Sequence, residues 1–421
     1  MAAAAIPDVE LSEIDQIEPA QETTCCIVGG GPGGMMLALL LARRGVKVTL
    51  LEAHKDFDRE FRGDTLHPSI LEILDQIGLA EPLHRLPHNK IYGPTFQSGG
   101  RSFAPIDFRR LKTRFPYILL IPQTKFLEFL AAEAKNYRTF QMRMVANVGA
   151  LIEGETGVCG VRYQSTDGWH ELRARLTVGA DGRFSKVRQL AGFEPIKTSP
   201  PMDILWFQLP HLPGDEHSDR VMGGFGNGRL LAVFDRIDYW QIGYVFPKGR
   251  YQQLRAAGMD AFRKSISEIE PRFAKHVEWL REWNQCSLLS VESSRCPIWH
   301  KPGLLLIGDA AHVMSPVGGV GINYAVQDAV VAANVLTVPL LNRDVHDRDL
   351  AKVQHQRESA TRVIQKIQSA MQTRLIASAL QWQGTLEVPW MVRLFLKIPI
   401  LRDLPARVLA FGVKRVRLEE D

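Results

Sequence analysis

The beginning of the chain alternates strand-like and helix-like stretches. Cys25–Val28 is a short apolar strand candidate, and Val46–Leu51 is a second one. Between them, Met35–Arg44 has the composition of a helix, and Gly45 stands where helices commonly end. Strand, helix and strand in this order predict a β-α-β unit over residues 24–52.

A glycine-rich turn joins the first strand to the helix. Its G-x-G-x-x-G pattern allows a tight turn at Gly29, close approach of a pyrophosphate at Gly31, and close helix–strand packing at Gly34. The helix N-terminus presents free N–H groups to phosphates. Glu52, 18 residues past Gly34, can accept hydrogen bonds from ribose and would repel a 2′-phosphate, so the expected dinucleotide is FAD or NAD. The binding candidates are Gly29, Gly31, Pro32, Gly33, Gly34 and Glu52.

Two later segments also lead from a strand into polar or glycine-rich residues. Leu176–Ala180 is strand-like and runs into Asp181. Gly303–Ile307 is fully apolar, as a buried parallel strand should be, and Asp309 follows it. Ligands bind at the carboxyl ends of such strands, which makes Asp309 a candidate. A glycine-rich bend at 316–323 then enters a helix, which predicts another anion site.

The middle of the chain predicts an antiparallel sheet. Ile204–Leu209 and Tyr239–Phe246 are strand candidates rich in aromatic residues. Asn227-Gly228 lies between them and is a strong hairpin signal, because both residues tolerate positive φ. This turn pairs Gly223 with Ala232. The glycines here lie within a hairpin, so no second dinucleotide site is expected.

The last third of the chain is predicted to be helical. Asp349 to about Ser378 contains no Gly or Pro and is rich in Ala, Gln, Lys and Arg. Met391–Leu418 mixes apolar and basic residues, which suits an anionic membrane surface or packing on the protein or a partner subunit. Pro399 and Pro405 would interrupt a long amphipathic helix and favour packing.

Composition excludes several classes of protein. Of 421 residues, 45% are hydrophobic and 23% charged, which excludes a disordered or fibrous chain. The longest clean apolar run, Met35–Ala42, is too short to span a membrane, and no signal peptide is expected. Five cysteines fit a reducing cytosol. Residues 1–22 form an expected mobile acidic leader, and the remaining net charge of +11 suits an anionic cofactor without implying nucleic acid.

Together, three separated motifs resemble those of the p-hydroxybenzoate hydroxylase-like, single-component FAD monooxygenases, including the ubiquinone-biosynthesis hydroxylases. The first is the glycine fingerprint with Glu52. The others are Asp181-Gly182…Ser185…Arg188 and Gly308-Asp309…Pro316…Gly321-x-Asn323…Asp328. Arg62 and Gln123 match more weakly, and Phe184 departs from the family pattern. The resemblance covers residues 24–333.

The resemblance implies an α/β fold with a Rossmann-like FAD-binding domain, an antiparallel substrate sheet and C-terminal helices. The FAD-binding domain would be discontinuous, over 23–92, 122–196 and 285–340. The substrate domain would comprise 93–121 and 197–284, and the C-terminal helical region 341–421.

The resemblance also assigns roles to residues. Asp309 would bind the ribityl or ribose hydroxyls of FAD, and the backbone near Gly321 would face the pyrimidine edge of the flavin. The added cofactor-binding candidates are Arg62, Gln123, Asp181, Arg188, Asp309, Pro316, Gly321, Ile322 and Asn323. The substrate sheet would cover the flavin, with Val221, Phe234 and Trp240 as candidate pocket-wall residues or, alternatively, as packing of the sheet core. His312 is expected to be structural.

The expected function is an FAD-dependent monooxygenase. It would use NAD(P)H and O₂ to hydroxylate or epoxidise an apolar or aromatic small molecule through a flavin hydroperoxide. A reductase of isoprenoid double bonds and a non-catalytic flavoprotein are the alternatives, and the W-x-W-x-I-P motif of halogenases is absent. The sequence does not identify a catalytic side chain, and no metal site is expected. The protein would be cytoplasmic, and both a homodimer and peripheral membrane contact remain open.

Overall fold

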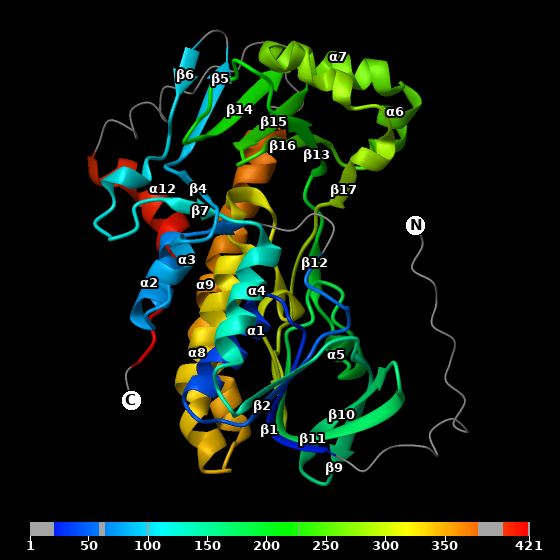
Figure 1. Ribbon diagram of the computed structural model, residues 1–421, viewed down its shortest axis with the longest axis vertical. Coiled ribbons are helices and arrows are strands. Elements are labelled where there is room, and N and C mark those ends of the chain that lie inside the picture. The colour runs from blue at the N-terminus through cyan, green and yellow to red at the C-terminus, as the bar shows by residue number, and fades with distance from the viewer. Residues whose placement is uncertain (1–20, 59–63, 99–100, 227, 378–398, 420–421) are drawn as a thin grey trace.

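The computed structural model describes residues 21–58, 64–98, 101–226, 228–377 and 399–419. Within them, two large sheets lie at opposite ends of the molecule (Figure 1). Strand β1 begins at Gln21, so the expected acidic leader runs into a strand at its last two residues. Arg62 and the segment 391–398 lie outside the described residues.

The larger sheet is built around parallel strands, in the order β19-β20-β11-β1-β2-β8, with β10 and β9 attached to β11. Central β1 is parallel to β2 and β11, and Cys25 lies beside Val48 and Leu176. The predicted β-α-β unit and the two later strands are therefore confirmed. The strands are β1 (Gln21–Val28), β2 (Val48–Leu51), β8 (Phe140–Arg143), β9 (Asn147–Gly154), β10 (Gly157–Ser165), β11 (Gly168–Gly179), β19 (His300–Lys301) and β20 (Leu304–Leu306).

Long helices cover this sheet and fill the centre of the molecule (Figure 1). They are α1 (Pro32–Arg43), α4 (Gln123–Ala134), α8 (Gly321–Leu341) and α9 (Asp347–Met371). Every residue of α1 from Gly33 to Ala42 is buried, as expected of a helix that is apolar on all sides. By length and composition, the segment Val317–Leu341 could cross a membrane. However, 67% of its most apolar 18-residue window is buried inside the protein. Helix α8 packs between α1 and α9, which is the position of a core helix.

The smaller sheet has the order β17-β13-β16-β15-β14-β5-β6. Gly223 pairs with Ala232, which confirms the register expected from the Asn-Gly turn. One prediction needs correction: β14 and β5 are parallel, with Val221 beside Pro94, so the sheet is mixed rather than wholly antiparallel. No hairpin joins these two strands, and their direction is therefore not constrained by a turn. The strands are β5 (Pro94–Ser98), β6 (Arg101–Phe103), β13 (Met202–Pro210), β14 (Val221–Gly226), β15 (Arg229–Asp235), β16 (Tyr239–Pro247) and β17 (Ser287–Ser290).

The two faces of the smaller sheet have different partners. Leu205 and Phe207 of β13 pack with Phe262 of α7, which lies over the sheet in Figure 1. Trp206, between them in sequence, points to the other face and belongs to a cluster that reaches Val317 in the third motif. Alternation along each strand therefore gives the sheet an outer face, under α7, and an inner face, toward the third motif.

Smaller elements connect these layers. The short strands form two further sheets, β3-β7-β4 and β12-β18-β21. Their bounds are β3 (Thr65–Leu66), β4 (Asn89–Ile91), β7 (Ile118–Leu120), β12 (Ile196–Thr198), β18 (Ser293–Arg295) and β21 (His312–Val313). The shorter helices are α2 (Pro68–Gln76), α3 (Ala80–His84), α5 (Lys186–Leu190), α6 (Tyr251–Ala256) and α7 (Met259–Ile269). Short helical turns are η2 (Phe108–Arg110), η3 (Pro271–Ala274), η4 (His276–Trp279), η5 (Trp283–Gln285), η6 (Gly308–Ala310), η7 (Val317–Gly319) and the π-helix η8 (Gln372–Ile376).

The described part of the C-terminal tail packs on the protein. Helix α12 (Pro399–Phe411) buries Ala406 and Ala410 in a cluster that includes Phe108. After the helix, the Arg415 guanidinium pairs with the Glu72 carboxylate of α2. The packing expected from the prolines is therefore observed for these residues.

An ion pair joins the smaller sheet to the rest of the protein. Arg236, directly after β15, donates from Nη2 to the Asp64 carboxylate at 2.8 Å. The other oxygen of Asp64 accepts the backbone N–H of Gln123 at 3.0 Å, at the start of α4. Burial raises the pKa of Asp64 in spite of the Arg236 charge. The ion pair thus offsets the cost of burying a carboxylate that also holds a helix terminus.

We expect Arg236→Met to lower the free energy of unfolding by about 3 kcal/mol, because it strands the Asp64 carboxylate in a largely buried position. Denaturant unfolding monitored by circular dichroism measures the change. The double variant Asp64→Asn/Arg236→Met should lose less free energy of unfolding than the two single variants lose together, since no buried charge is then left without its partner. Strict additivity would show that the two residues do not act as a pair.

Candidate active site

The N-termini of helices α1 and α8 lie next to each other. A Cβ built on Gly33, in the first turn of α1, would lie 3.1 Å from the carbonyl oxygen of Ala325 in α8. A side chain at this position would make a tight contact with α8, so glycine favours the close approach of the two helices. The positive ends of two helix dipoles therefore meet at one place, where they favour negatively charged ligands.

The glycines of the first motif divide into two groups. A Cβ on Gly34 would lie 2.0 Å from the Gly29 carbonyl oxygen, and one on Gly29 would lie 2.5 Å from that of Ala180. These two glycines serve the packing of turn, helix and strand. By contrast, a Cβ on Gly31 or on Gly321 of α8 would meet no described atom within 4 Å. Open space thus lies beside both helix N-termini, where the sequence predicts the pyrophosphate and the flavin.

Glu52 closes one end of this site. Its Oε2 accepts the backbone N–H of Gly30 at 2.8 Å, and its Oε1 accepts that of His54 at 2.9 Å. The side chain is nearly buried, at 6% exposure. The carboxylate is thus fixed beside the glycine turn, in the position expected for a ribose ligand.

Asp181 and Ser185 of the second motif both cap helix α5. The Asp181 carboxylate accepts the Ser185 hydroxyl and, at 3.0 Å, the backbone N–H of Val187. The Ser185 hydroxyl in turn accepts the backbone N–H of Arg188 at 2.9 Å. Burial raises the pKa of Asp181, while these hydrogen bonds oppose the rise. The second motif is therefore a helix-capping unit at the end of β11.

Arg188 ties the second motif to the third. Its guanidinium donates to the carbonyl oxygens of Arg183 at 2.8 Å and Ala310 at 3.0 Å. The side chain is 8% exposed. These bonds make Arg188 a positioning residue for the 308–310 turn, and its direct contact with a cofactor stays a prediction. Phe184, on the same turn, is 79% exposed.

A buried carboxylate holds the turn from the other side. Asp328 of α8 accepts the backbone N–H of Gly308 at 3.0 Å and a ring N–H of His312 at 2.6 Å. Its other oxygen accepts Nε of Arg357 at 2.7 Å, from helix α9. Burial alone would raise the pKa of Asp328, but His312 and Arg357 outweigh it and lower that pKa. His312 is therefore structural, as expected, and the turn that carries half-buried Asp309 is fixed on both sides.

His67 joins the third motif to the C-terminal helix. Its backbone N–H donates to Asn323 Oδ1 at 3.0 Å, and its ring Nδ1 donates to the Leu409 carbonyl oxygen at 2.7 Å. Burial lowers the pKa of His67 to about 4, although the bond to Leu409 opposes this. The ring is neutral near pH 7, so Nε2 is an acceptor, and it has no hydrogen-bond partner among the described residues. The sequence contained no signal for this role.

The remaining flavin candidates lie around the same helix terminus. Pro316 precedes η7, and Ile322 and Asn323 lie in the first turn of α8. Asn323 is turned inward, since its side chain also donates to the Gly319 carbonyl oxygen at 3.2 Å. Gln123 starts α4 beside Asp64. The direct cofactor contacts of all these residues stay predictions, as does that of Arg62.

The three pocket-wall candidates do not lie together. Phe234 and Val221 pack on the inner face, in the cluster that includes α12. Trp240 lies on the outer face, 1% exposed, and donates from Nε1 to Asp215 at 2.8 Å. The pocket-wall interpretation of Trp240 therefore needs correction, and its alternative, packing of the sheet core, is the observed one. On the inner face, the ring centroid of Trp206 lies 6.0 Å from that of Phe234.

Comparison with known proteins decides the family. The family described as "FAD binding domain" matches residues 22–373. The chain is also 34% identical, over 384 residues, to the 6-methylpretetramide 4-monooxygenase of Streptomyces rimosus, with 90% of each chain covered. The chain belongs to the p-hydroxybenzoate hydroxylase-like FAD-dependent monooxygenases. The predictions of family, fold class and FAD as cofactor are confirmed.

Other relatives of this FAD-dependent monooxygenase agree with the assignment. It is 30% identical to a 12-dehydrotetracycline 5-monooxygenase/anhydrotetracycline 6-monooxygenase of S. rimosus, over 63% of its own length and 52% of the relative's. Among solved structures, the anhydrotetracycline hydroxylase OxyS of S. rimosus has a TM-score of 0.74 at 22% identity, covering 95% of this chain and 78% of that one. PqsL of Pseudomonas aeruginosa also has a TM-score of 0.74 at 22% identity, over 86% of this chain and 100% of that one. The last two similarities concern the fold.

Two glycine variants of the monooxygenase should separate cofactor binding from folding. Gly31→Ala adds a methyl group in open space, so the protein should fold but bind FAD at least about tenfold more weakly, because the methyl group stands where the pyrophosphate approaches. Gly34→Ala places the methyl group against the Gly29 carbonyl and should destabilise the fold itself. Fluorescence titration of the apoprotein with FAD, together with thermal unfolding, measures both effects. Unchanged FAD affinity in Gly31→Ala would contradict the site.

Proposed function

We propose that this monooxygenase hydroxylates an aromatic, phenolic substrate with electrons from NAD(P)H and one oxygen atom from O₂. The observation that carries the proposal is the convergence of the three motifs at the N-termini of α1 and α8. Its similarity to the 6-methylpretetramide 4-monooxygenase, over 90% of both chains, supports the same class of reaction.

The described residues are suited to hold FAD at four points. Glu52 would hold a ribose, the N–H groups at the start of α1 the pyrophosphate, Asp309 the ribityl chain, and the start of α8 the pyrimidine edge of the ring. The open space beside Gly31 and Gly321 leaves room for these contacts. Bound FAD supplies the redox chemistry, which is acceptance of a hydride and activation of O₂.

The protein's own part is electrostatic and steric. The N-terminus of α8 favours negative charge on the pyrimidine side of the ring, worth about 0.3–1 kcal/mol near a helix terminus. Neutral His67 adds no positive charge at neutral pH, and its Nε2 can accept a hydrogen bond. The inner face of the smaller sheet would exclude water from the reacting atoms.

The inner face also suggests the substrate class. Trp206 and Phe234 form an aromatic pair there, in clusters of apolar residues that reach Val317 and α12. Gly243 makes room for the indole ring, since a Cβ at this position would lie 2.8 Å from Trp206. Such a surface suits a flat aromatic ring. Relatives are named for 6-methylpretetramide, anhydrotetracycline and pentachlorophenol, which supports an aromatic substrate.

The decisive experiment follows electrons and oxygen together. The FAD-loaded protein is reduced anaerobically with NADPH or NADH and then mixed with isotopically labelled O₂ and a panel of phenols. We expect one labelled oxygen atom in the product for each NAD(P)H oxidised. Product formed without O₂ would favour a reductase, and no substrate-dependent NAD(P)H oxidation would favour a non-catalytic flavoprotein.

Trp206→Ala should uncouple the reaction. With the indole removed from the inner face, the substrate is held less well, so NAD(P)H oxidation should continue while the yield of hydroxylated product falls several-fold. Trp279→Ala is the control, because this tryptophan is 53% exposed and lies in the short turn η4 rather than on a strand of the sheet. Equal coupling in both variants would argue against substrate binding on the inner face. Homodimer formation and membrane contact stay separate predictions.

A further inference from the structure

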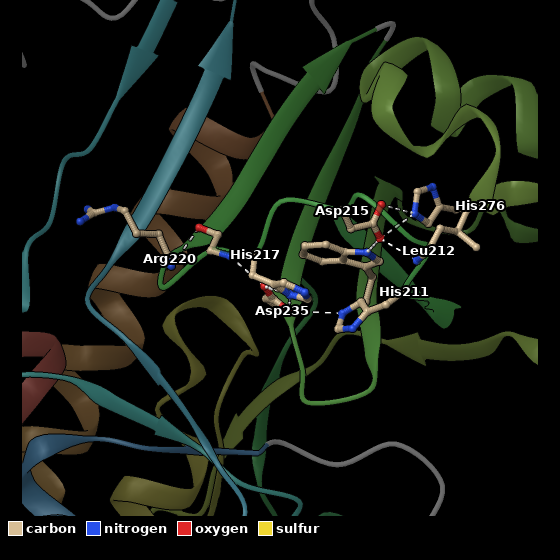
Figure 2. A network of polar contacts seen from close by, with 9 residues as sticks. His211, Leu212, Asp215, His217, Arg220, Asp235 and His276 are labelled. Carbon is tan, nitrogen blue, oxygen red and sulfur yellow. Dashed lines mark hydrogen bonds and ion pairs between the residues drawn. The ribbon is translucent and has the colours of Figure 1, made fainter.

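Two histidines and a buried aspartate meet at the edge of the smaller sheet (Figure 2). His211 directly follows β13, and His217 lies in the connection between β13 and β14. Asp235 is the last residue of β15 and is 3% exposed. Their nearest nitrogen and oxygen atoms all lie within 4.8 Å of one another.

The two nitrogen–oxygen distances at Asp235 are close to the distances between ligands of one metal ion. His211 Nε2 lies 3.3 Å from Asp235 Oδ1, and His217 Nδ1 lies 3.0 Å from Asp235 Oδ2. Ligands at about 2.0–2.2 Å from a tetrahedral zinc ion stand roughly 3.3–3.6 Å apart. Two imidazole nitrogens and one carboxylate form a ligand set suited to zinc and related divalent ions.

The cluster is held in place by its surroundings. Asp235 Oδ2 accepts the backbone N–H of Ser218 at 2.7 Å. The ring of Trp240 lies 4.9 Å from that of His211 and 6.0 Å from that of His217, centroid to centroid. Trp240 is itself anchored by its hydrogen bond to Asp215. Second contacts of this kind orient ligands before the ion binds.

The alternative to a metal site is that the histidines only form hydrogen bonds with Asp235. The neighbouring Asp215 is an example of a carboxylate that is satisfied by hydrogen bonds. Asp215 accepts three N–H groups, from Leu212, Trp240 and His276, at 2.8–3.0 Å (Figure 2). At Asp235, His217 forms a hydrogen bond, but the buried Nε2 of His211 forms none with acceptable geometry among the described residues. A ring nitrogen aimed at a carboxylate without such a bond is what a bridging cation would explain.

The local charge favours a cation. Four carboxylates act on the single guanidinium of Arg272, which packs over the Trp240 ring at 5.1 Å. They are Asp215, Glu216, Asp235 and Glu270. The excess of negative charge at this edge of the sheet would be reduced by a divalent ion.

We propose that His211, His217 and Asp235 bind a zinc-class divalent cation, with water in the remaining coordination positions. His217 is 61% exposed, so the ion can enter from solvent. The ion would fix the connection before β14 to the end of β15. The next residue, Arg236, points the other way and pairs with Asp64. Bound metal would therefore stabilise the contact between the smaller sheet and the rest of the protein, independently of which substrate is hydroxylated.

Zinc retention by the full-length, FAD-loaded protein tests the proposal, with any affinity tag removed. The protein is stripped with a chelator, loaded with zinc chloride at pH 7.5, dialysed, and analysed for zinc per chain. We expect one zinc ion per chain, and an affinity at least about 100-fold lower in His211→Gln and His217→Gln. Zinc should raise the melting temperature of the unaltered protein and leave that of both variants unchanged.

His300→Gln is the matched control, because His300 also faces a carboxylate, that of Asp347 at 2.8 Å, but belongs to no group of three candidate ligands among the described residues. This variant should bind zinc as the unaltered protein does. Glutamine can still donate a hydrogen bond, so His217→Gln, at an exposed position, should fold in either case. Zinc bound equally by all four proteins, or by none, would overturn the proposal while leaving the monooxygenase function untouched.

Discussion

The buried carboxylate of Asp328 is the interaction on which the site depends most. It has no exposed surface, and its partners come from three parts of the chain: the 308–310 turn, His312 and helix α9. A buried charge is tolerated when it is paired and hydrogen-bonded, and the Asp328 carboxylate accepts three hydrogen bonds. The carboxylate thus fixes the turn that presents Asp309 and, through Arg357, docks α9 against α8.

Arg188 completes this arrangement from the opposite direction. Its guanidinium donates to the carbonyl oxygen of Arg183 in the second motif and to that of Ala310 in the third. Arg188 therefore holds the two motifs together. The last residue of the second motif, Arg188, and the first residue of the third, Gly308, are 120 residues apart in the chain, and neither motif could form the site alone. Charged side chains that sequence analysis assigns to the cofactor therefore also serve to hold backbone in place.

Cofactor binding was predictable because it depends on local backbone. A glycine turn between a strand and a helix has the same geometry in any chain, and Gly29, Gly31 and Gly34 are in the order that this geometry requires. The parallel sheet followed from the same unit. The Asn-Gly turn likewise determined the register of Gly223 with Ala232, since a two-residue hairpin allows little else.

The substrate side was less predictable because it depends on which way each side chain points. One step along a strand moves a residue to the other face of the sheet. Trp206 of β13 therefore lies on the inner face, whereas Trp240 of β16 lies on the outer face. His67 was missed for a similar reason: its partners, Asn323 and Leu409, come from distant segments. The parallel pairing of β5 with β14 involves no turn and left no local signal.

The same alternation connects the two faces of the smaller sheet. Asp235 belongs to the outer face, with the histidines and Trp240, whereas Arg236 reaches Asp64 at the start of α4. Consecutive residues at the end of one strand thus link the histidine cluster to the domain that binds FAD. An ion on the outer face could not touch a substrate on the inner face. Its influence on the reaction would pass through this strand end, and so through how firmly the ion pair of Arg236 with Asp64 holds the sheet.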